Sequence, residues 1–125
     1  MKKDPYAALQ RLLKTKRWEE ALVQVDALLV SNPLAAQLHL LRGQLIQLQS
    51  ESTAYSLADA EAAFTRALAL DGTYFDALVE LMHFYGAVCA DTPKAIAYAE
   101  QVKALAQKAL DAARDVLEDT TARVS

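Results

Sequence analysis

Apolar residues recur every three or four positions along most of the chain, and polar residues fill the positions between them. This spacing places the apolar side chains on one face of an α-helix, and no run alternates apolar with polar residues as a half-buried strand does. The pattern therefore predicts an all-α protein. The expected helices cover about residues 5–14, 16–31, 34–49, 56–70, 74–90 and 93–118.

Local signals mark several ends of these helices. Asp4 and Pro5 combine a carboxylate cap with a proline at the first helical position, where its missing N–H costs nothing. Ser56 and Asp59 have the spacing of a capping box, with aspartate in place of glutamate. Gly72 is expected to close the helix before it as a glycine cap.

One stretch predicts a defined packing partner for its helix. Ala60, Phe64 and Ala67 lie along one helical face in the order small, large, small, which lets a neighbouring helix approach closely around the ring. Gly43, in the middle of the third expected helix, weakens that helix and is expected to permit a close helix–helix contact.

The same periodicity predicts which residues are buried in the other helices. The third helix is expected to bury Leu38, Leu41, Leu45 and Leu48, and the fifth Leu78, Leu81, Met82, Tyr85 and Cys89. The last helix carries two stripes. The inner one is Ala95, Ala99, Val102, Ala106, Leu110, Ala113 and Leu117, and the second is Tyr98, Val102, Leu105, Ala109, Ala112 and Val116.

Composition narrows the class of protein. With 54% apolar and 23% charged residues, a chain of 125 residues is expected to form one globular domain. A net charge of -3 argues against a strongly basic nucleic-acid binder. A single cysteine gives no internal disulfide, and no stretch has the length of a membrane span, so a soluble cytoplasmic protein without membrane association is expected.

The residues that most often carry chemistry are few and scattered. His39, His83 and Cys89 share no metal-ligand spacing, and no phosphate-binding loop, nucleophile motif or paired-carboxylate signature is present. The sequence therefore predicts no metal site, no cofactor and no enzymatic activity. Cys89 is expected to be a buried thiol.

Two segments resemble half-units of the tetratricopeptide-repeat (TPR) family. Trp18-Glu19-Glu20-Ala21, followed by Asn32-Pro33, is similar to the second helix and closing turn of a unit, and the Ala60, Phe64 and Ala67 stretch resembles the same half. Arg42-Gly43 is similar to a common first-helix variant. The resemblance implies a right-handed α-solenoid of three antiparallel helix pairs with an extended C-terminal helix, in one domain covering residues 1–125. The implied units are about 5–33, 34–72 and 74–107, followed by a helical extension over about 108–118 and a tail over 119–125.

The resemblance also implies a function. Partners of this family usually lie in the concave groove formed by the first helix of each pair, and a non-catalytic adaptor that binds a helix or extended peptide there is expected. The implied groove residues are Tyr6, Gln10, Lys14, Gln37, Leu40, Gln44, Gln47, Asp76, Val79 and His83. Two alternatives are a secretion-type chaperone for an aggregation-prone client and a self-assembling structural unit.

The second stripe of the last helix bears on self-assembly. Its spacing of four and three residues is that of a coiled coil, although its alanines make the seam shallow. The last helix is longer than the helix before it, so the segment beyond Gln107 has no partner of matching length. It therefore either caps the solenoid or projects and pairs with another copy. Because no Gly or Pro offers a hinge there, a straight helix and a weak homodimer contact are favoured.

Overall fold

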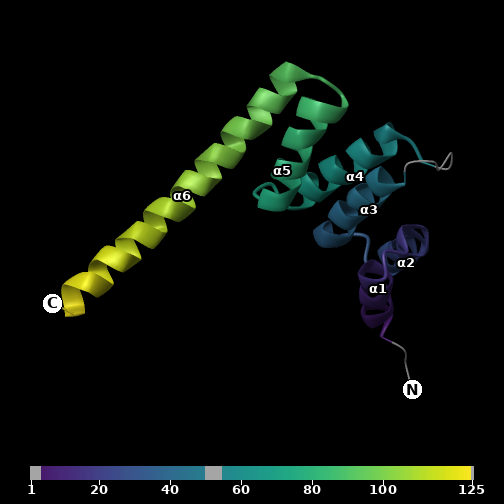
Figure 1. The fold of residues 1–125 in the computed structure, drawn as a ribbon, viewed down its shortest axis with the longest axis horizontal. Coiled ribbons are helices and arrows are strands. Elements are labelled where there is room, and N and C mark those ends of the chain that lie inside the picture. The colour runs from purple at the N-terminus through teal and green to yellow at the C-terminus, as the bar shows by residue number, and fades with distance from the viewer. Residues whose placement is uncertain (1–3, 50–54, 125) are drawn as a thin grey trace. The chain divides into compact units, whose positions relative to one another are not determined.

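The computed structural model describes residues 4–49 and 55–124, and these residues form helices joined by turns, with no β-strand among them. The expectation of an all-α protein is confirmed for this part of the chain. In order, the helices are α1 (Pro5–Lys14), α2 (Trp18–Ser31), α3 (Ala36–Leu48), α4 (Leu57–Leu70), α5 (Phe75–His83), the π-helix η1 (Phe84–Val88) and α6 (Thr92–Val124) (Figure 1).

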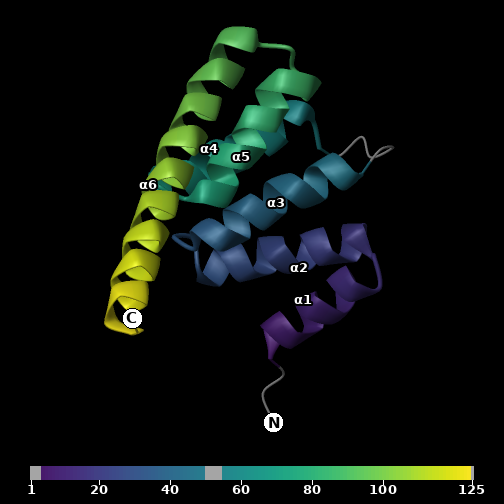
Figure 2. The ribbon, with the colours of Figure 1, turned by 60° about the vertical axis from the view of Figure 1, so that its left-hand side comes forward.

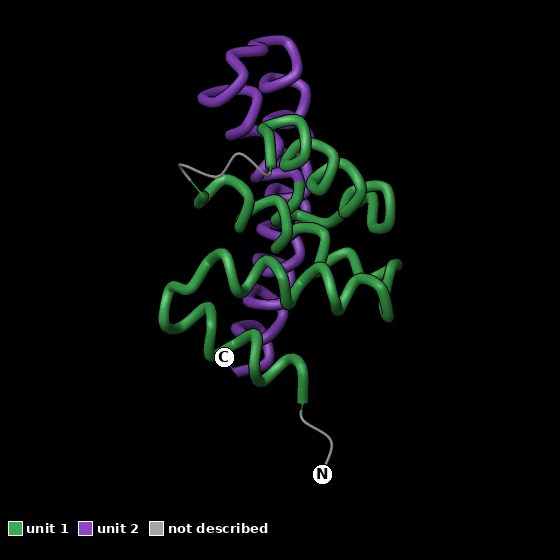
Figure 3. The backbone as a smooth tube through the Cα atoms, turned by 90° about the vertical axis from the view of Figure 1, so that its right-hand side faces the viewer, with its two compact units in different colours: residues 1–77 green, residues 78–125 purple. Residues whose placement is uncertain are grey.

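The chain divides into two compact units, coloured separately in Figure 3. Unit 1 comprises residues 1–77 and contains α1 to α4 with the first residues of α5. Unit 2 comprises residues 78–125 and contains the remainder of α5, η1 and α6. The boundary falls within a helix, because the first turn of α5 is assigned to unit 1 and the following turns to unit 2.

Within unit 1, consecutive helices pack against each other. The substantial contacts join α1 to α2, α2 to α3 and α3 to α4, which places α3 between two neighbours (Figure 2). Leu22, Val25, Leu45 and Phe64 are among its largest fully buried side chains. Burial of such side chains supplies the main driving force for folding, roughly 1.5–3 kcal/mol for each large apolar side chain.

Two of the helix starts in unit 1, those of α1 and α4, follow the local signals, whereas one helix end does not. Tyr6 N–H donates to Asp4 Oδ1 at 2.9 Å, and Ser56 N–H donates to Asp59 Oδ2 at 2.8 Å while Asp59 N–H donates to Ser56 Oγ at 3.4 Å. The capping box is thus confirmed. The expected glycine cap is wrong, because Asp71 follows the last residue of α4 as its C-cap and no glycine has a positive φ. Asp71 Oδ1 instead accepts from Thr73 N–H at 3.2 Å and closes the turn.

The closest helix contact in unit 1 is the one that Gly43 allows. A Cβ atom added to Gly43 would lie 2.5 Å from Cε1 and 2.7 Å from Cδ1 of the Phe64 ring. The ring itself is fully buried, as are Ala60 and Ala67 on either side of it. Both expectations are therefore confirmed: Gly43 permits close approach, and the Ala60, Phe64 and Ala67 face is buried.

The buried face of α3 differs from the predicted one. Leu38 and Leu45 are buried as expected, but Leu48 is 51% exposed, and the buried residues extend to Leu40 and Ile46. The reason is that α3 packs between two helices, so its buried arc is wider than one stripe and is rotated away from Leu48. A pattern based on a single face could not show this.

Unit 2 begins with an interruption of the α-helical ladder. Cys89 N–H donates to the Phe84 carbonyl five residues earlier, at 2.8 Å, which is the bond of a π-helix. The Tyr85 ring stacks on Tyr98 of α6 with centroids 5.7 Å apart and an interplanar angle of 9°. Leu78, Leu81 and Tyr85 are buried as expected. Cys89 is exposed, contrary to expectation, because the wider turn shifts it off the helical stripe.

The last helix is longer than the sequence indicated. It continues to Val124, past the expected end near Glu118, so residues 119–124 are helical and not a tail. Asp119 Oδ2 and Arg123 Nη2 form an ion pair at 3.1 Å, and the Thr121 hydroxyl donates to the Leu117 carbonyl at 2.8 Å. These short-range contacts help to extend a segment that has no Gly or Pro to end it.

The Gly43 contact makes a prediction for stability. Gly43→Ala should lower the free energy of unfolding by about 1–3 kcal/mol, because the added methyl group overlaps the Phe64 ring. Helix propensity alone predicts the opposite, a gain of about 1 kcal/mol. Gly72→Ala is the matched control, since nothing lies within 4 Å of its added Cβ, and it should be nearly neutral. Urea unfolding of the two full-length variants measures both free energies of unfolding. If Gly43→Ala proves as stable as wild type, the close contact between Gly43 and Phe64 is contradicted.

Candidate functional site

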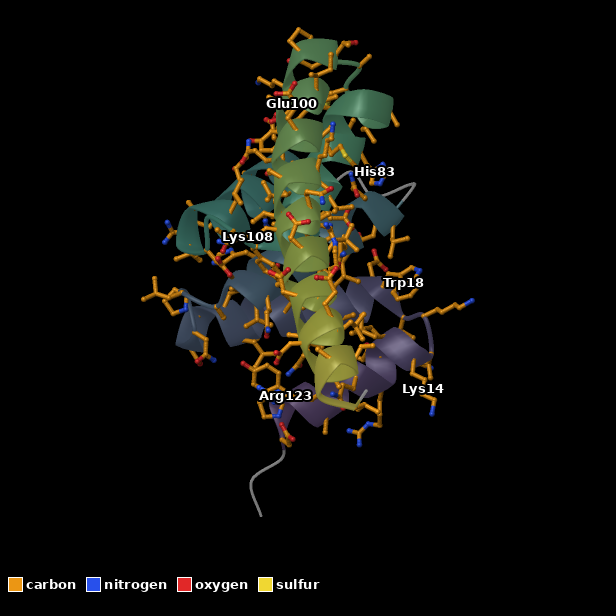
Figure 4. All side chains as sticks on the ribbon, turned by 90° about the vertical axis from the view of Figure 1, so that its left-hand side faces the viewer. Lys14, Trp18, His83, Glu100, Lys108 and Arg123 are labelled. Carbon is orange, nitrogen blue, oxygen red and sulfur yellow. The ribbon has the colours of Figure 1, made fainter. Side chains whose placement is uncertain are left out.

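Seven of the ten predicted groove residues lie on α1 and α3 in unit 1, and six of these seven are at least partly accessible. Tyr6, Gln10 and Lys14 on α1 are exposed, and Gln37 on α3 is exposed, whereas Gln44 and Gln47 are half-buried. Lys14 is marked in Figure 4. Both helices pack against α2. These six residues have the accessibility that partner binding requires, and their joint role stays a prediction.

Leu40 is the exception among the predicted groove residues on these two helices. It is 6% exposed and so offers almost no surface to a partner. Leu40 lies one helical turn before Gly43, which touches α4, so it shares the face of α3 that is turned toward that helix. Its expected exposure was wrong because the sequence did not show that α3 is covered on two sides.

The last three predicted groove residues are on α5, which crosses the boundary between the units. Asp76 in unit 1 is exposed, and in unit 2 Val79 is half-buried and His83 exposed. Their grouping with the residues of α1 and α3 stays a prediction.

A hollow in unit 1 has the size and lining of a binding site. It has a volume of about 390 Å³ and is lined by Glu19, Glu20, Leu22, Val23, Gln49 and Tyr55. The first four come from the first two turns of α2, Gln49 caps the C-terminal end of α3, and Tyr55 precedes α4. None of the ten predicted groove residues lines it. Its size is within the usual range for sites that take a small ligand or a side chain.

The lining of the hollow combines an apolar floor with acidic and amide groups. Leu22 is buried, while Val23 is 69% exposed and presents its apolar side chain. The carboxylates of Glu19 and Glu20 lie in the first turn of α2, and Glu20 also pairs with Arg17 at 3.5 Å. The Gln49 side-chain nitrogen is buried and has no hydrogen-bond partner among the described residues. A buried donor without a partner costs roughly 1–3 kcal/mol, so this amide lowers the stability of the end of α3.

A polar network holds Tyr55 at the edge of the hollow. Arg42 Nε donates to Asp26 Oδ1 at 2.8 Å, and the Tyr55 hydroxyl donates to Asp26 Oδ2 at 3.0 Å. The Arg42 guanidinium also lies 5.5 Å from the centroid of the Tyr55 ring. One carboxylate thereby links α2, α3 and the entry to α4. Burial raises the pKa of the Tyr55 phenol, and its hydrogen bond to Asp26 raises that pKa further.

Metal-binding and nucleophilic groups do not converge in the described residues. No group of three or more His, Cys, Asp or Glu side chains there has the geometry of a metal site. His39 Nε2 donates to the Pro33 carbonyl at 2.8 Å and so fastens the turn between α2 and α3. The described helices also include none that is long and apolar enough to cross a bilayer.

Comparison of the chain with protein-family models, with curated proteins and with solved structures finds no match. The geometry of the hollow and the packing of the helices are therefore the grounds for assigning a function.

Sequence reasoning missed both the hollow and the polar network at its edge. Arg42 stood out as part of Arg42-Gly43, but its partner Asp26 lies 16 positions away on another helix and carries no local signal. Val23 falls outside the buried stripe of α2, where an isolated exposed valine is ordinary. Their significance depends on how α2 and α3 pack together, which periodicity does not encode.

The raised pKa of Tyr55 predicts how stability depends on pH. The folded state holds the phenol proton at a pH where the unfolded chain, with a pKa near 10.0, releases it. The contribution of Tyr55 is thus fully present below about pH 10 and is lost as pH rises through the folded-state pKa. Chemical unfolding from pH 9 to 11 should show a less steep loss of stability in Tyr55→Phe than in wild type. If the free energy of unfolding falls with pH equally steeply in both proteins, the Tyr55 phenol is not shielded as described.

Proposed function

We propose that this protein is a non-catalytic protein-binding module that recognises an extended peptide or a helix of a partner protein. The hollow lined by α2, Gln49 and Tyr55 is the observation that carries the proposal. Its apolar floor suits a buried side chain of the partner, and the adjacent carboxylates suit a basic residue.

The chemistry of the lining defines the partner segment more closely. A segment with an aliphatic or aromatic residue next to Lys or Arg fits both parts of the lining. The apolar side chain contacts the floor, and the basic side chain contacts the carboxylates. Tyr55 is held by Asp26 and Arg42 before any partner arrives, so binding does not have to order it. Such preorganisation lowers the entropic cost of association.

The architecture that we propose for this module is a stack of helix pairs like that of TPR proteins, wound as a right-handed solenoid. Its support is the packing of consecutive helices in unit 1 and the buried Ala60, Phe64 and Ala67 face. In that arrangement the exposed residues Tyr6, Gln10, Lys14 and Gln37 would form a second contact surface for a long partner. Leu40 has no part in it because it is buried.

Selection from a peptide library tests this proposal without a known partner. Full-length protein should enrich peptides that place an aliphatic or aromatic residue beside Lys or Arg. Val23→Glu should weaken binding of the selected peptides by roughly tenfold or more, because it removes an apolar contact and buries a carboxylate, and the weak attraction of that carboxylate for a nearby basic residue does not offset this cost. Val30→Glu is the matched control on the same helix, since Val30 is 84% exposed and lies outside the hollow.

Thermal melts of both variants establish that each remains folded, as expected for substitutions at exposed positions. A selection that enriches no common pattern contradicts the proposal. Equal loss of binding in Val23→Glu and Val30→Glu would place the binding surface outside the hollow.

A further inference from the structure

The second half of α6 is an amphipathic helix that the rest of unit 2 leaves uncovered. Half-buried residues occur on α6 as far as Ala106, and every residue from Gln107 to Val124 is exposed. The exposed set includes Leu110 at 60%, Val116 at 65% and Leu117 at 67%. In unit 2 the helix continues well past the segment that packs against η1 (Figure 1). A run of apolar residues on an exposed helix indicates a contact surface.

Small side chains form the middle of this apolar face. At about 100° per residue, Ala109, Ala112 and Val116 follow one line along the helix, with Ala106 and Ala113 directly beside it. Leu110 and Leu117 stand at one edge of the face, and Lys108 and Asp115 at the other. The alanines allow a second helix to approach closely, and the larger residues then close over the sides of the contact.

Charge along α6 changes sign near its middle. From Thr92 to Lys108 there are three lysines and one glutamate, and from Ala109 to Val124 there are four acidic residues and two arginines. Figure 4 marks Glu100, Lys108 and Arg123 along the helix. A parallel pair of such helices would place like halves together, whereas an antiparallel pair places each basic half beside an acidic one.

The charges at the edge of the face fix the register of that pair. Asp111 pairs with Arg114 at 2.6 Å and Asp119 with Arg123 at 3.1 Å, all within one helix. Lys108 and Asp115 form no ion pair or hydrogen bond among the described residues. They lie seven residues, about two helical turns, apart on the same edge. An antiparallel alignment centred near Asp111 therefore sets each Lys108 beside Asp115 of the other copy.

We infer that the occupant of this face is a second copy of the chain, bound antiparallel through residues 105–116 of α6. Ala109 then packs against Ala112 of the second copy at the centre, and Leu105 against Val116 on either side. A parallel pair in register would set Lys108 opposite Ala113 and leave both charges unpaired. The contact is short, because the half-buried residues of the first half of α6, among them Tyr98 stacked on Tyr85, lie on this same face. The two helices therefore cross at an angle that carries residues 117–124 of the second copy away from η1. The homodimer is accordingly weak and reversible.

A charge exchange in the full-length protein tests both the contact and its direction. Sedimentation equilibrium in reducing buffer, needed because Cys89 is exposed, should show a monomer–dimer equilibrium at concentrations on the order of tens of micromolar. Lys108→Glu and Asp115→Lys should each raise the dissociation constant roughly five- to tenfold, because two attractive pairs become repulsive. The double variant Lys108→Glu with Asp115→Lys should restore it to within about threefold of wild type.

Glu100→Lys is the control, because Glu100 is exposed on the side of α6 opposite the proposed contact, and it should leave the dissociation constant unchanged. Circular dichroism verifies that every variant keeps its helix content. A wild-type protein that remains monomeric, or a double variant that dimerises no better than the single ones, overturns the inference. An equal increase of the dissociation constant in Glu100→Lys would also overturn the inference.

Discussion

The contact between Gly43 and the Phe64 ring is the constraint on which unit 1 depends. Because Gly43 has no side chain, α4 can place a fully buried aromatic ring against the backbone of α3. The neighbouring residue Arg42 then reaches Asp26 on α2, and Asp26 in turn accepts from Tyr55. One turn of α3 thereby joins an apolar contact on one side to a polar network on the other. The polar network in turn holds Tyr55 at the edge of the hollow.

Features that depend on neighbours in sequence could be predicted. Asp4 caps α1 and the Ser56–Asp59 box starts α4, because each involves groups within three residues of one another. The face of Ala60, Phe64 and Ala67 followed from helical periodicity, which α4 obeys along its whole length. The glycine at position 43 was informative because it contradicts helix propensity, and such a conflict signals a tertiary requirement.

Features that depend on three-dimensional packing could not be predicted from the sequence. Leu40 is buried and Leu48 exposed because α3 is covered by two helices. Cys89 is exposed because a π-helix interrupts the stripe, and no residue type specifies that interruption. Lys16 adopts a left-handed conformation with φ of 59°, and Arg17 N–H donates to the Leu12 carbonyl at 2.9 Å in a helix-ending motif that usually contains glycine. The candidate hollow was missed for the same reason, since its lining comes from three separate segments.

The account rests on the ring of Phe64 lying against Gly43, and nuclear Overhauser spectroscopy of the full-length protein tests this most directly. The α protons of Gly43 should show strong cross-peaks to the ring protons of Phe64, because the structure leaves no space between them for another side chain. Cross-peaks from Phe64 to other residues of the core but none to Gly43 would contradict the account. In that case the order of packing from α2 through α3 to α4 would have to be reconsidered.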